Sequence, residues 1–213
     1  MKLFTKSLII FFFIGLTSLT SFGQSDAKST QILEAMGKKY KALPSYTVTF
    51  SYRYGKEVPV MGELGVKGEK YFLKLTDQEI YNDGKAIATF LKDSKEVTIQ
   101  DFSDDQNSSL NPARIFTSYQ KGYKSEFVKT ATENGVQCNI VRLTPLEKNS
   151  PVSKVELSIV QKDNSLKTWK ITEKNGTVSN YKIEKFDTST PLSDGLFSFN
   201  SKKFPEVEIV DLR

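Results

Sequence analysis

Hydrophobic and polar positions alternate along residues 45–54, which read SYTVTFSYRY. Side chains of a β-strand point alternately to its two faces, so this pattern predicts a strand with one apolar face. Four of the five side chains on that face are aromatic, and so large an apolar surface must be covered either by the protein or by a ligand. The alternation leaves both possibilities open. The five residues are Tyr46, Val48, Phe50, Tyr52 and Tyr54.

In two other segments the apolar side chains have the spacing that is typical of a helix. Residues 26–43 carry apolar side chains at every fourth position, and Pro44 ends the segment. The recurring side chains are Ile32, Met36 and Tyr40. Residues 111–119 begin with Asn-Pro, a pair that is typical of the first positions of a helix. The apolar side of this second helix is formed by Ile115, Phe116 and Tyr119.

Short apolar or alternating segments separated by turn residues fill the rest of the chain. The turns at 82–85 (NDGK) and 175–176 (NG) are typical of hairpins. We expect about eleven strands in an antiparallel sheet, because the loops are too short for parallel crossovers. After the first strand, the segments lie near 58–66, 71–75, 79–81, 86–92, 96–102, 123–130, 136–146, 155–159, 166–174 and 177–186, followed by 196–199 and 206–210. The second strand contains Gly62, Gly65 and Gly68, which suggest a bulge or bend.

An antiparallel sheet of this size must curl, and a curl larger than an eight-stranded barrel leaves room inside. Only two helices are available to fill its concave face. The pattern therefore predicts a sheet wrapped round helices, either with an apolar cavity between them or with the helices filling the space completely.

Composition narrows the functional classes. The chain has 213 residues, a net charge of +5, one cysteine and no histidine. Without histidine the commonest general base and a frequent metal ligand are missing, and no nucleophile–base pair or metal cluster emerges from the spacings. The single cysteine cannot form an intrachain disulfide. The mild, dispersed basicity is not typical of a nucleic-acid-binding protein. We expect no catalytic residue, no cofactor and no metal.

The first residues have the features of a secretory signal peptide. Two lysines precede an apolar run, and small residues precede a cleavage point between Gly23 and Gln24. Removal of residues 1–23, which include both lysines, lowers the net charge from +5 to +3. We therefore expect an exported, periplasmic protein with one domain over residues 24–213.

The order of several short motifs resembles the LolA family of periplasmic carriers of outer-membrane lipoproteins. The likeness extends from residue 26 to residue 212, and the ordered set carries it rather than any single motif. The motifs are SYTVTF at 45–50, GELGVK at 62–67, DGK at 83–85, the Pro-led helix at 111–119, LTP at 143–145, FSF at 197–199 and PEV at 205–207.

This resemblance implies a mainly β fold, an unclosed antiparallel half-barrel wrapped round two lid helices, with a cavity that takes acyl chains. The implied cavity wall is Tyr46, Val48, Phe50, Tyr52, Tyr54, Leu64 and Val66. The implied underside of the lid is Ile32, Met36 and Tyr40 with Ile115, Phe116 and Tyr119. The implied function is to carry lipoproteins from the inner to the outer membrane. The implied partners of this monomer are acylated lipoproteins, an inner-membrane lipoprotein-releasing ABC transporter and an outer-membrane acceptor.

The chain departs from the family at one position. Family members often have an arginine near the end of the second strand, where it holds the lid closed, and this chain has Gly68 there. Lys67, Lys70 and Arg53 are the candidates to replace that arginine. A lysine ammonium, however, is less suited than a guanidinium to donate hydrogen bonds to several carbonyl groups at once. The main alternative function is a periplasmic lipid- or lipoprotein-sensing module on the same scaffold.

Overall fold

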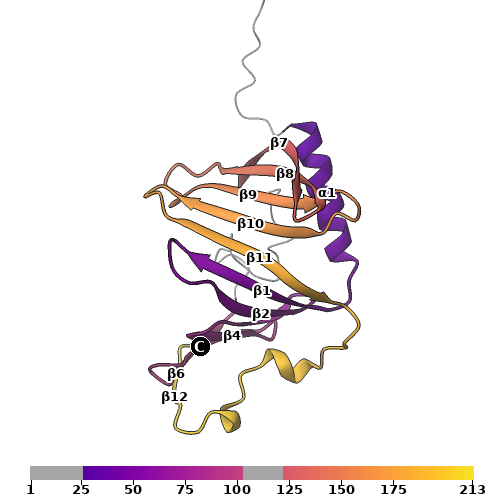
Figure 1. The fold of residues 1–213 in the computed structure, drawn as a ribbon. Coiled ribbons are helices and arrows are strands. Elements are labelled where there is room, and N and C mark those ends of the chain that lie inside the picture. Colours follow the sequence, from indigo (N-terminus) through magenta and orange to yellow (C-terminus); the bar gives the residue numbers. More distant parts are fainter. Residues whose placement is uncertain (1–25, 103–121) are drawn as a thin grey trace, which may run out of the picture.

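Twelve strands form one sheet in the computed structural model, which describes residues 26–102 and 122–213. The sheet is unclosed, with β12 at one edge and β7 at the other (Figure 1). Its spatial order is β12-β6-β5-β4-β3-β2-β1-β11-β10-β9-β8-β7. The strands are β1 (Tyr46–Tyr54), β2 (Val60–Lys67), β3 (Lys70–Lys74), β4 (Gln78–Asn82), β5 (Ala86–Leu91), β6 (Glu96–Asp101), β7 (Tyr123–Glu133), β8 (Val136–Pro145), β9 (Val152–Val160), β10 (Leu166–Glu173), β11 (Val178–Asp187) and β12 (Glu208–Asp211). The predicted mainly β half-barrel is confirmed.

The helix α1 (Ala27–Lys41) packs against one face of this sheet (Figure 1). It begins at Asp26, whose carboxylate accepts a hydrogen bond from the Ser29 backbone N–H, as is common at helix N-termini. It is not long and apolar enough to span a membrane, and neither is any other helix among the described residues. The predicted signal peptide and the predicted second helix at 111–119 lie outside those residues.

The face that packs against α1, which we call the helix-side face, carries the larger apolar core. On β1 this face is formed by Tyr46, Val48 and Phe50, as the alternation predicts. Its buried members are Ile32, Leu33, Met36 and Tyr40 of α1 with Tyr46, Val48, Phe50, Leu64, Val66, Tyr71, Val141, Leu143, Val155, Leu157, Ile159, Leu166 and Trp169 of the sheet.

A second core lies on the opposite face, the outer face, over β3–β6. Residues 188–207, which we call the C-terminal segment, cross this face between β11 and β12 (Figure 1). The segment buries Leu192 and Phe197 against the sheet, and two lysines fasten it: Lys67 and Lys70 both pair with Asp194. The buried members of this core are Phe72, Tyr81, Ala88, Phe90, Val97, Leu192 and Phe197.

Three local predictions about the sheet are wrong. First, β12 pairs with β6 in parallel, because the C-terminal segment is long enough to act as a crossover. Second, residues 196–199 form no strand, because a 3₁₀ turn at Asp194–Phe197 points Phe197 into the outer core. Third, β2 has no bulge, and its pairing with β1 and β3 runs without a register shift.

The glycines of β2 instead make room for aromatic rings on both faces. A Cβ atom on Gly62 would lie 2.4 Å from the Phe50 ring, and one on Gly65 would lie 2.3 Å from the Phe72 ring. Both distances are far inside van der Waals contact. Phe50 belongs to the helix-side core and Phe72 to the outer core, so β2 separates the two.

Candidate functional site

The predicted cavity wall is assembled by the pairing of β1 with β2. The register places Tyr46 opposite Val66 and Val48 opposite Leu64 on the helix-side face. These four residues and Phe50 are buried, with 5% or less of their surface exposed. Tyr52 is half-buried, and Tyr54, at the end of the strand, is 47% exposed. Six of the seven predicted residues therefore lie in one apolar cluster, and burial decreases toward the β1–β2 hairpin, where Tyr54 lies outside the cluster.

The described half of the predicted lid covers this surface. Ile32, Met36 and Tyr40 lie on the buried side of α1 and belong to the same apolar cluster as the wall. The ring of Tyr40 lies 5.9 Å from that of Tyr46 and 5.6 Å from that of Phe186, in tilted and edge-on arrangements. Ile115, Phe116 and Tyr119 lie outside the described residues.

The sequence interpretation missed the part of this face that β8–β10 supply. In β9 the period-two alternation of Val155, Leu157 and Ile159 is a signal that could have found part of it, since it resembles that of β1. In β10 a register shift separates Leu166 from Trp169, and in β8 the adjacent Ile140 and Val141 are both buried, so alternation alone does not identify the residues of these two strands. The site residues missed there are Val141, Leu143, Val155, Leu157, Ile159 and Leu166.

Aromatic rings form a row across three neighbouring strands of the helix-side face. Trp169 of β10 stacks on Tyr181 of β11, with centroids 4.6 Å apart and an angle of 2° between the rings. Tyr52 of β1 stacks on the other side, 6.1 Å from Tyr181. These rings cover one another's faces, so they present mainly edges to anything that lies over the sheet. Such a surface suits a flexible apolar chain better than a flat ring.

Polar contacts hold α1 at both of its ends. Near the C-terminal end, the Tyr40 hydroxyl accepts a hydrogen bond of 3.0 Å from the Leu166 backbone N–H, and the Lys39 ammonium lies 2.7 Å from the Asp163 carboxylate. Burial raises the pKa of Tyr40 to about 12, so its hydroxyl is neutral at physiological pH. The pKa of Asp163 is lowered: burial alone would raise it, but hydrogen bonds from Lys39 and Ser165 outweigh that effect.

At the N-terminal end, Asp26 and Ser29 connect α1 to the edge strand β7. The Asp26 carboxylate accepts a hydrogen bond from the Phe127 backbone N–H, and the Ser29 and Ser125 hydroxyls lie 2.8 Å apart in a buried contact. Burial alone would raise the pKa of Asp26, but backbone hydrogen bonds from Ser29 and Phe127 lower it below the ordinary value. Between the two ends, α1 is held by apolar packing.

None of the three residues considered as replacements for the family's lid-holding arginine has a polar contact with α1 in the part of the chain that the structure describes. Lys67 donates to the Leu192 carbonyl oxygen and, with Lys70, pairs with Asp194, so both lysines hold the C-terminal segment. Arg53 points to the outer face, as its place in the alternation predicts. Gly68 occupies a turn with φ +60°. Among the described residues, the polar contacts of α1 therefore come from Asp26, Ser29, Lys39 and Tyr40 instead.

The family follows from comparison of the whole sequence with known families. The sequence model described as "Outer membrane lipoprotein carrier protein LolA" matches residues 74–200, which is more than half of the chain. The chain belongs to the LolA family. The matched residues include β4–β11 and most of the C-terminal segment, whereas α1, β1 and β2 precede the matched range. No curated protein sequence matches the chain.

Solved structures similar to this LolA-family chain share its fold at low sequence identity. An uncharacterized conserved protein from Thermus thermophilus aligns with a TM-score of 0.60 and 11% identity, over 86% of this chain and 99% of that one. A chain in the MucA/MucB complex of Pseudomonas aeruginosa aligns with a TM-score of 0.51 and 15% identity. That alignment covers 83% of this chain but only 62% of the other. At these identities the likeness establishes the fold.

Proposed function

We propose that this protein is a periplasmic carrier that binds the acyl chains of lipoproteins between α1 and the helix-side face. In this proposal it receives lipoproteins from an inner-membrane ABC transporter and delivers them to an acceptor at the outer membrane. The observation that carries the proposal is the continuous aromatic and aliphatic wall of β1 and β2 beneath a helix with polar contacts at its two ends. Membership of the LolA family supports it. No bond is made or broken in such a transfer, so no catalytic residue or cofactor is required.

Burial energies explain why a carrier is needed. Each methylene group removed from water contributes roughly 0.8 kcal/mol, so an acyl chain does not cross an aqueous compartment unaided. The apolar side of α1 already covers the wall with Ile32, Leu33 and Met36. An entering acyl chain would replace these side chains on the wall, and one apolar contact would be exchanged for another. The free-energy difference between closed and loaded states is then small, which allows release without ATP.

The contacts of α1 fit such an exchange. The Lys39–Asp163 pair is partly exposed, and exposed ion pairs typically contribute about 0–1 kcal/mol. The hydrogen bonds at Asp26 and Tyr40 are individually worth about 1 kcal/mol. No disulfide can lock the helix, because the chain has one cysteine. The contacts thus define a closed position of α1 without making it permanent.

Trp169 provides an internal reporter for a test, because it is the only tryptophan and belongs to the helix-side core. Delipidated protein is titrated with dibrominated stearic acid, whose bromine atoms quench indole fluorescence on contact, and with unbrominated stearic acid. We expect saturable quenching with the brominated acid alone. The matched control is Trp169→Phe/Phe204→Trp, which moves the reporter to the outer core, where we expect no quenching.

A second measurement identifies the natural cargo. Native mass spectrometry of protein isolated from its own periplasm should detect bound lipoprotein or lipid. Absence of bound lipid, together with absence of quenching at Trp169, would contradict the proposal. Equal quenching of the control variant would also contradict it, because it would mean that acyl chains adsorb to both faces.

A further inference from the structure

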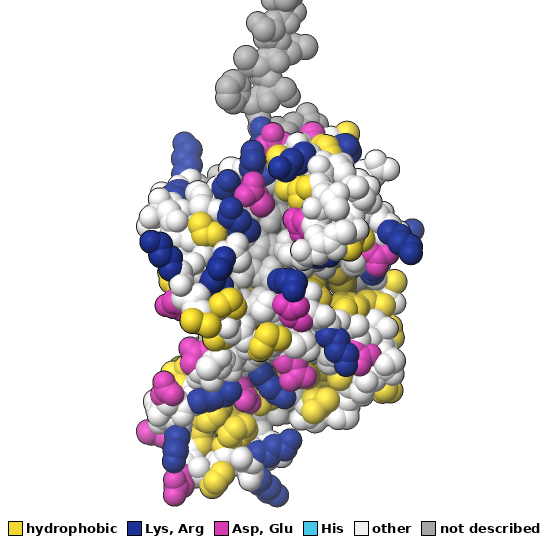
Figure 2. Space-filling view, in the orientation of Figure 1, with side chains coloured by type: hydrophobic (Ala, Val, Ile, Leu, Met, Phe, Trp, Pro, Cys, Tyr) yellow, Lys and Arg dark blue, Asp and Glu magenta, His cyan; other side chains and the backbone are white. Residues whose placement is uncertain are grey.

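A groove runs across the outer face of the strands whose other face lies under α1. It has a volume of about 620 Å³ and is lined by side chains of β1 and β7–β11. Direct pairing places its polar and charged lining residues on one face, since Ser51 lies opposite Lys182, Thr168 opposite Ser158 and Lys170 opposite Glu156. Tyr52, Trp169 and Tyr181, whose positions alternate with these along β1, β10 and β11, also border the groove. The C-terminal segment covers the outer face only over β3–β6, so this groove is open to solvent (Figure 2).

Positive charge predominates among the side chains that line the groove. Four cations, Arg53, Lys129, Lys170 and Lys182, face two carboxylates, Glu133 and Glu156. Figure 2 shows that lysine and arginine side chains are numerous on this face of the molecule. A groove with a net positive lining attracts anionic groups.

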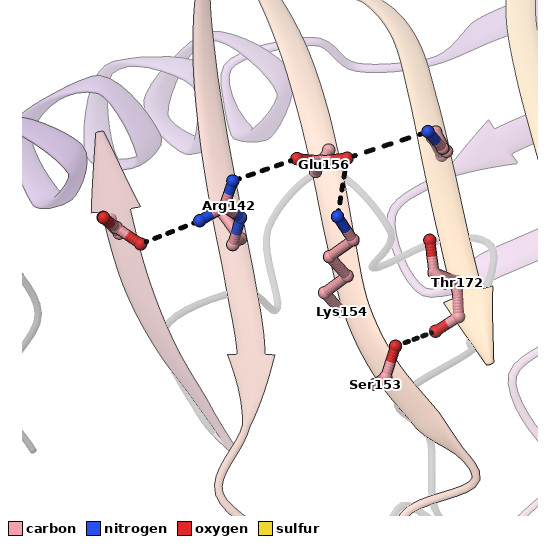
Figure 3. Close-up of polar contacts among 7 residues, drawn as sticks. Arg142, Ser153, Lys154, Glu156 and Thr172 are labelled. Carbon is pink, nitrogen blue, oxygen red and sulfur yellow. Dashed lines mark hydrogen bonds and ion pairs between the residues drawn. The ribbon is translucent and has the colours of Figure 1, made fainter. Parts of the chain in front are cut away.

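The two carboxylates already have partners. Glu133 accepts hydrogen bonds from the Ser158 and Thr168 hydroxyls, at 2.7 and 3.3 Å. Glu156 lies at the centre of an ion-pair network on β8–β10, with Arg142 at 3.3 Å and Lys154 at 3.4 Å (Figure 3). Burial alone would raise the pKa of Glu156, but these two cations lower it, so the carboxylate stays charged and paired.

Two of the cations, in contrast, can pair with an anionic ligand. Among the described residues, neither Arg53 on β1 nor Lys129 on β7 has an acidic side chain within ion-pair distance, and both are exposed. Lys170 is only weakly engaged, at 4.0 Å from Glu156. Lys182 is held by Glu184 at 2.7 Å. The free charges thus lie on the first and last of the strands that line the groove, and polar side chains line the strands between them.

We propose that this groove binds an extended acidic segment of a partner protein. A chain that crosses the strands would meet a free cation at each end, with the side-chain amide of Asn180 on β11 between them for its backbone. Sugar ligands fit less well, because the rings of Tyr52, Trp169 and Tyr181 stack on one another. A membrane surface fits less well, because the site is hollow and six charged residues line it. The charged residues of the groove and the buried residues of the acyl-chain wall lie on opposite faces of the sheet, and Tyr52 borders both.

The test uses a fluorescein-labelled peptide of alternating glutamate and serine, about ten residues long, which can span several strands at about 3.3 Å per residue. Binding to the full-length mature protein is followed by fluorescence anisotropy at low and at physiological salt. We expect saturable binding that weakens with salt, because exposed ion pairs are screened. A peptide with glutamine in place of glutamate should not bind.

The deciding comparison is between two double variants with the same loss of charge. Arg53→Ala/Lys129→Ala removes the free cations of the groove, and we expect the Kd to rise about fivefold or more. Lys202→Ala/Lys203→Ala removes two exposed lysines of the C-terminal segment, and we expect the Kd to change by less than about twofold. Equal effects would overturn the proposal, since net charge alone would explain them, and so would the absence of saturable binding. Circular dichroism checks that both variants fold. Because no acyl chain is involved, failure here leaves the result at Trp169 unaffected.

Discussion

The sheet has two halves whose apolar cores lie on opposite faces. In β1, β2 and β7–β11, which we call the helix-covered half, the core lies under α1. In β3–β6, which we call the tail-covered half, a second core lies on the other face. Strand β3 takes part in both, with Tyr71 buried on the helix-side face and Phe72 on the outer face. The covers also differ. The first is a helix with polar contacts at its ends, and the second is an irregular segment anchored by buried phenylalanine and leucine side chains.

This difference assigns separate parts to the two halves in the proposed mechanism. The proposed exchange of α1 for an acyl chain would affect one face of the helix-covered half. The tail-covered half keeps its own core throughout and can hold the sheet in shape. We therefore expect disruption of the outer core to destabilise the whole fold, whereas changes at α1 should act on binding as well as on stability.

The largest expected effect comes from Phe197, which is fully buried in the outer core. Phe197→Ala should reduce the free energy of unfolding by about 3–5 kcal/mol, because it removes a large side chain and leaves a cavity. Its neighbour Leu196 is 38% exposed, and Leu196→Ala should cost less than about 1 kcal/mol. Urea unfolding followed by circular dichroism measures both. Similar losses for the two variants would show that the outer core is not packed as described.

An intermediate effect is expected at the two glycines of β2. Gly65→Ala should cost about 1–3 kcal/mol, because the new methyl group would overlap the Phe72 ring, which packs against Phe197 and cannot move freely. Gly62→Ala should cost less, because the Phe50 ring packs against the partly buried rings of Tyr52 and Tyr181, which leave it more freedom to shift.

The control for this pair is Gly195→Ala, where a Cβ atom would meet nothing within 4 Å. Its unfolding free energy should be close to that of the wild type. Chemical denaturation ranks the three variants by their free energy of unfolding. If Gly62→Ala lost more unfolding free energy than Gly65→Ala, the helix-covered half would be the more rigidly packed of the two.

The smallest effect concerns the N-terminal contacts of α1. Asp26→Ala should cost about 1 kcal/mol through loss of the N-cap, and it should also leave the Phe127 N–H without its acceptor. The folded-state pKa of Asp26 lies below its ordinary value, so its contribution is present above about pH 4 and is lost as the pH falls through the folded-state pKa. Thermal unfolding measured between neutral and acidic pH should therefore show a smaller loss of stability in the variant than in the wild type. An unchanged pH dependence would contradict this role.

Local patterns in the sequence predicted most of the fold. The alternation of β1 and the turns with Asn-Gly or Asp-Gly set the strands to within a few residues, and the order of motifs indicated the family. The parallel pairing of β12 was not predictable from local pattern, because it depends on where the C-terminal segment docks. Phe197 and Phe199 alternate as in a strand, but burial of Phe197 against Phe72 favours a 3₁₀ turn.

The candidate site was predictable in part for the same reason. Residues of β1 and β2 are close in the sequence, so their pairing could be inferred from one hairpin. The contribution of Leu157 or Trp169 depends on the order of distant strands. The groove was out of reach, because Arg53 and Lys129 come together only through the pairing of six strands.

The parallel pairing of β12 with β6 has a consequence for the order of events during synthesis. The C-terminal segment leaves the ribosome after all the strands it covers. Until then the outer face of β3–β6 exposes Phe72, Phe90 and Val97, and a contact of such long sequence separation forms slowly. The outer core therefore cannot form in the nascent chain until synthesis is nearly complete. That delay leaves an interval in which chaperones can bind the exposed apolar side chains.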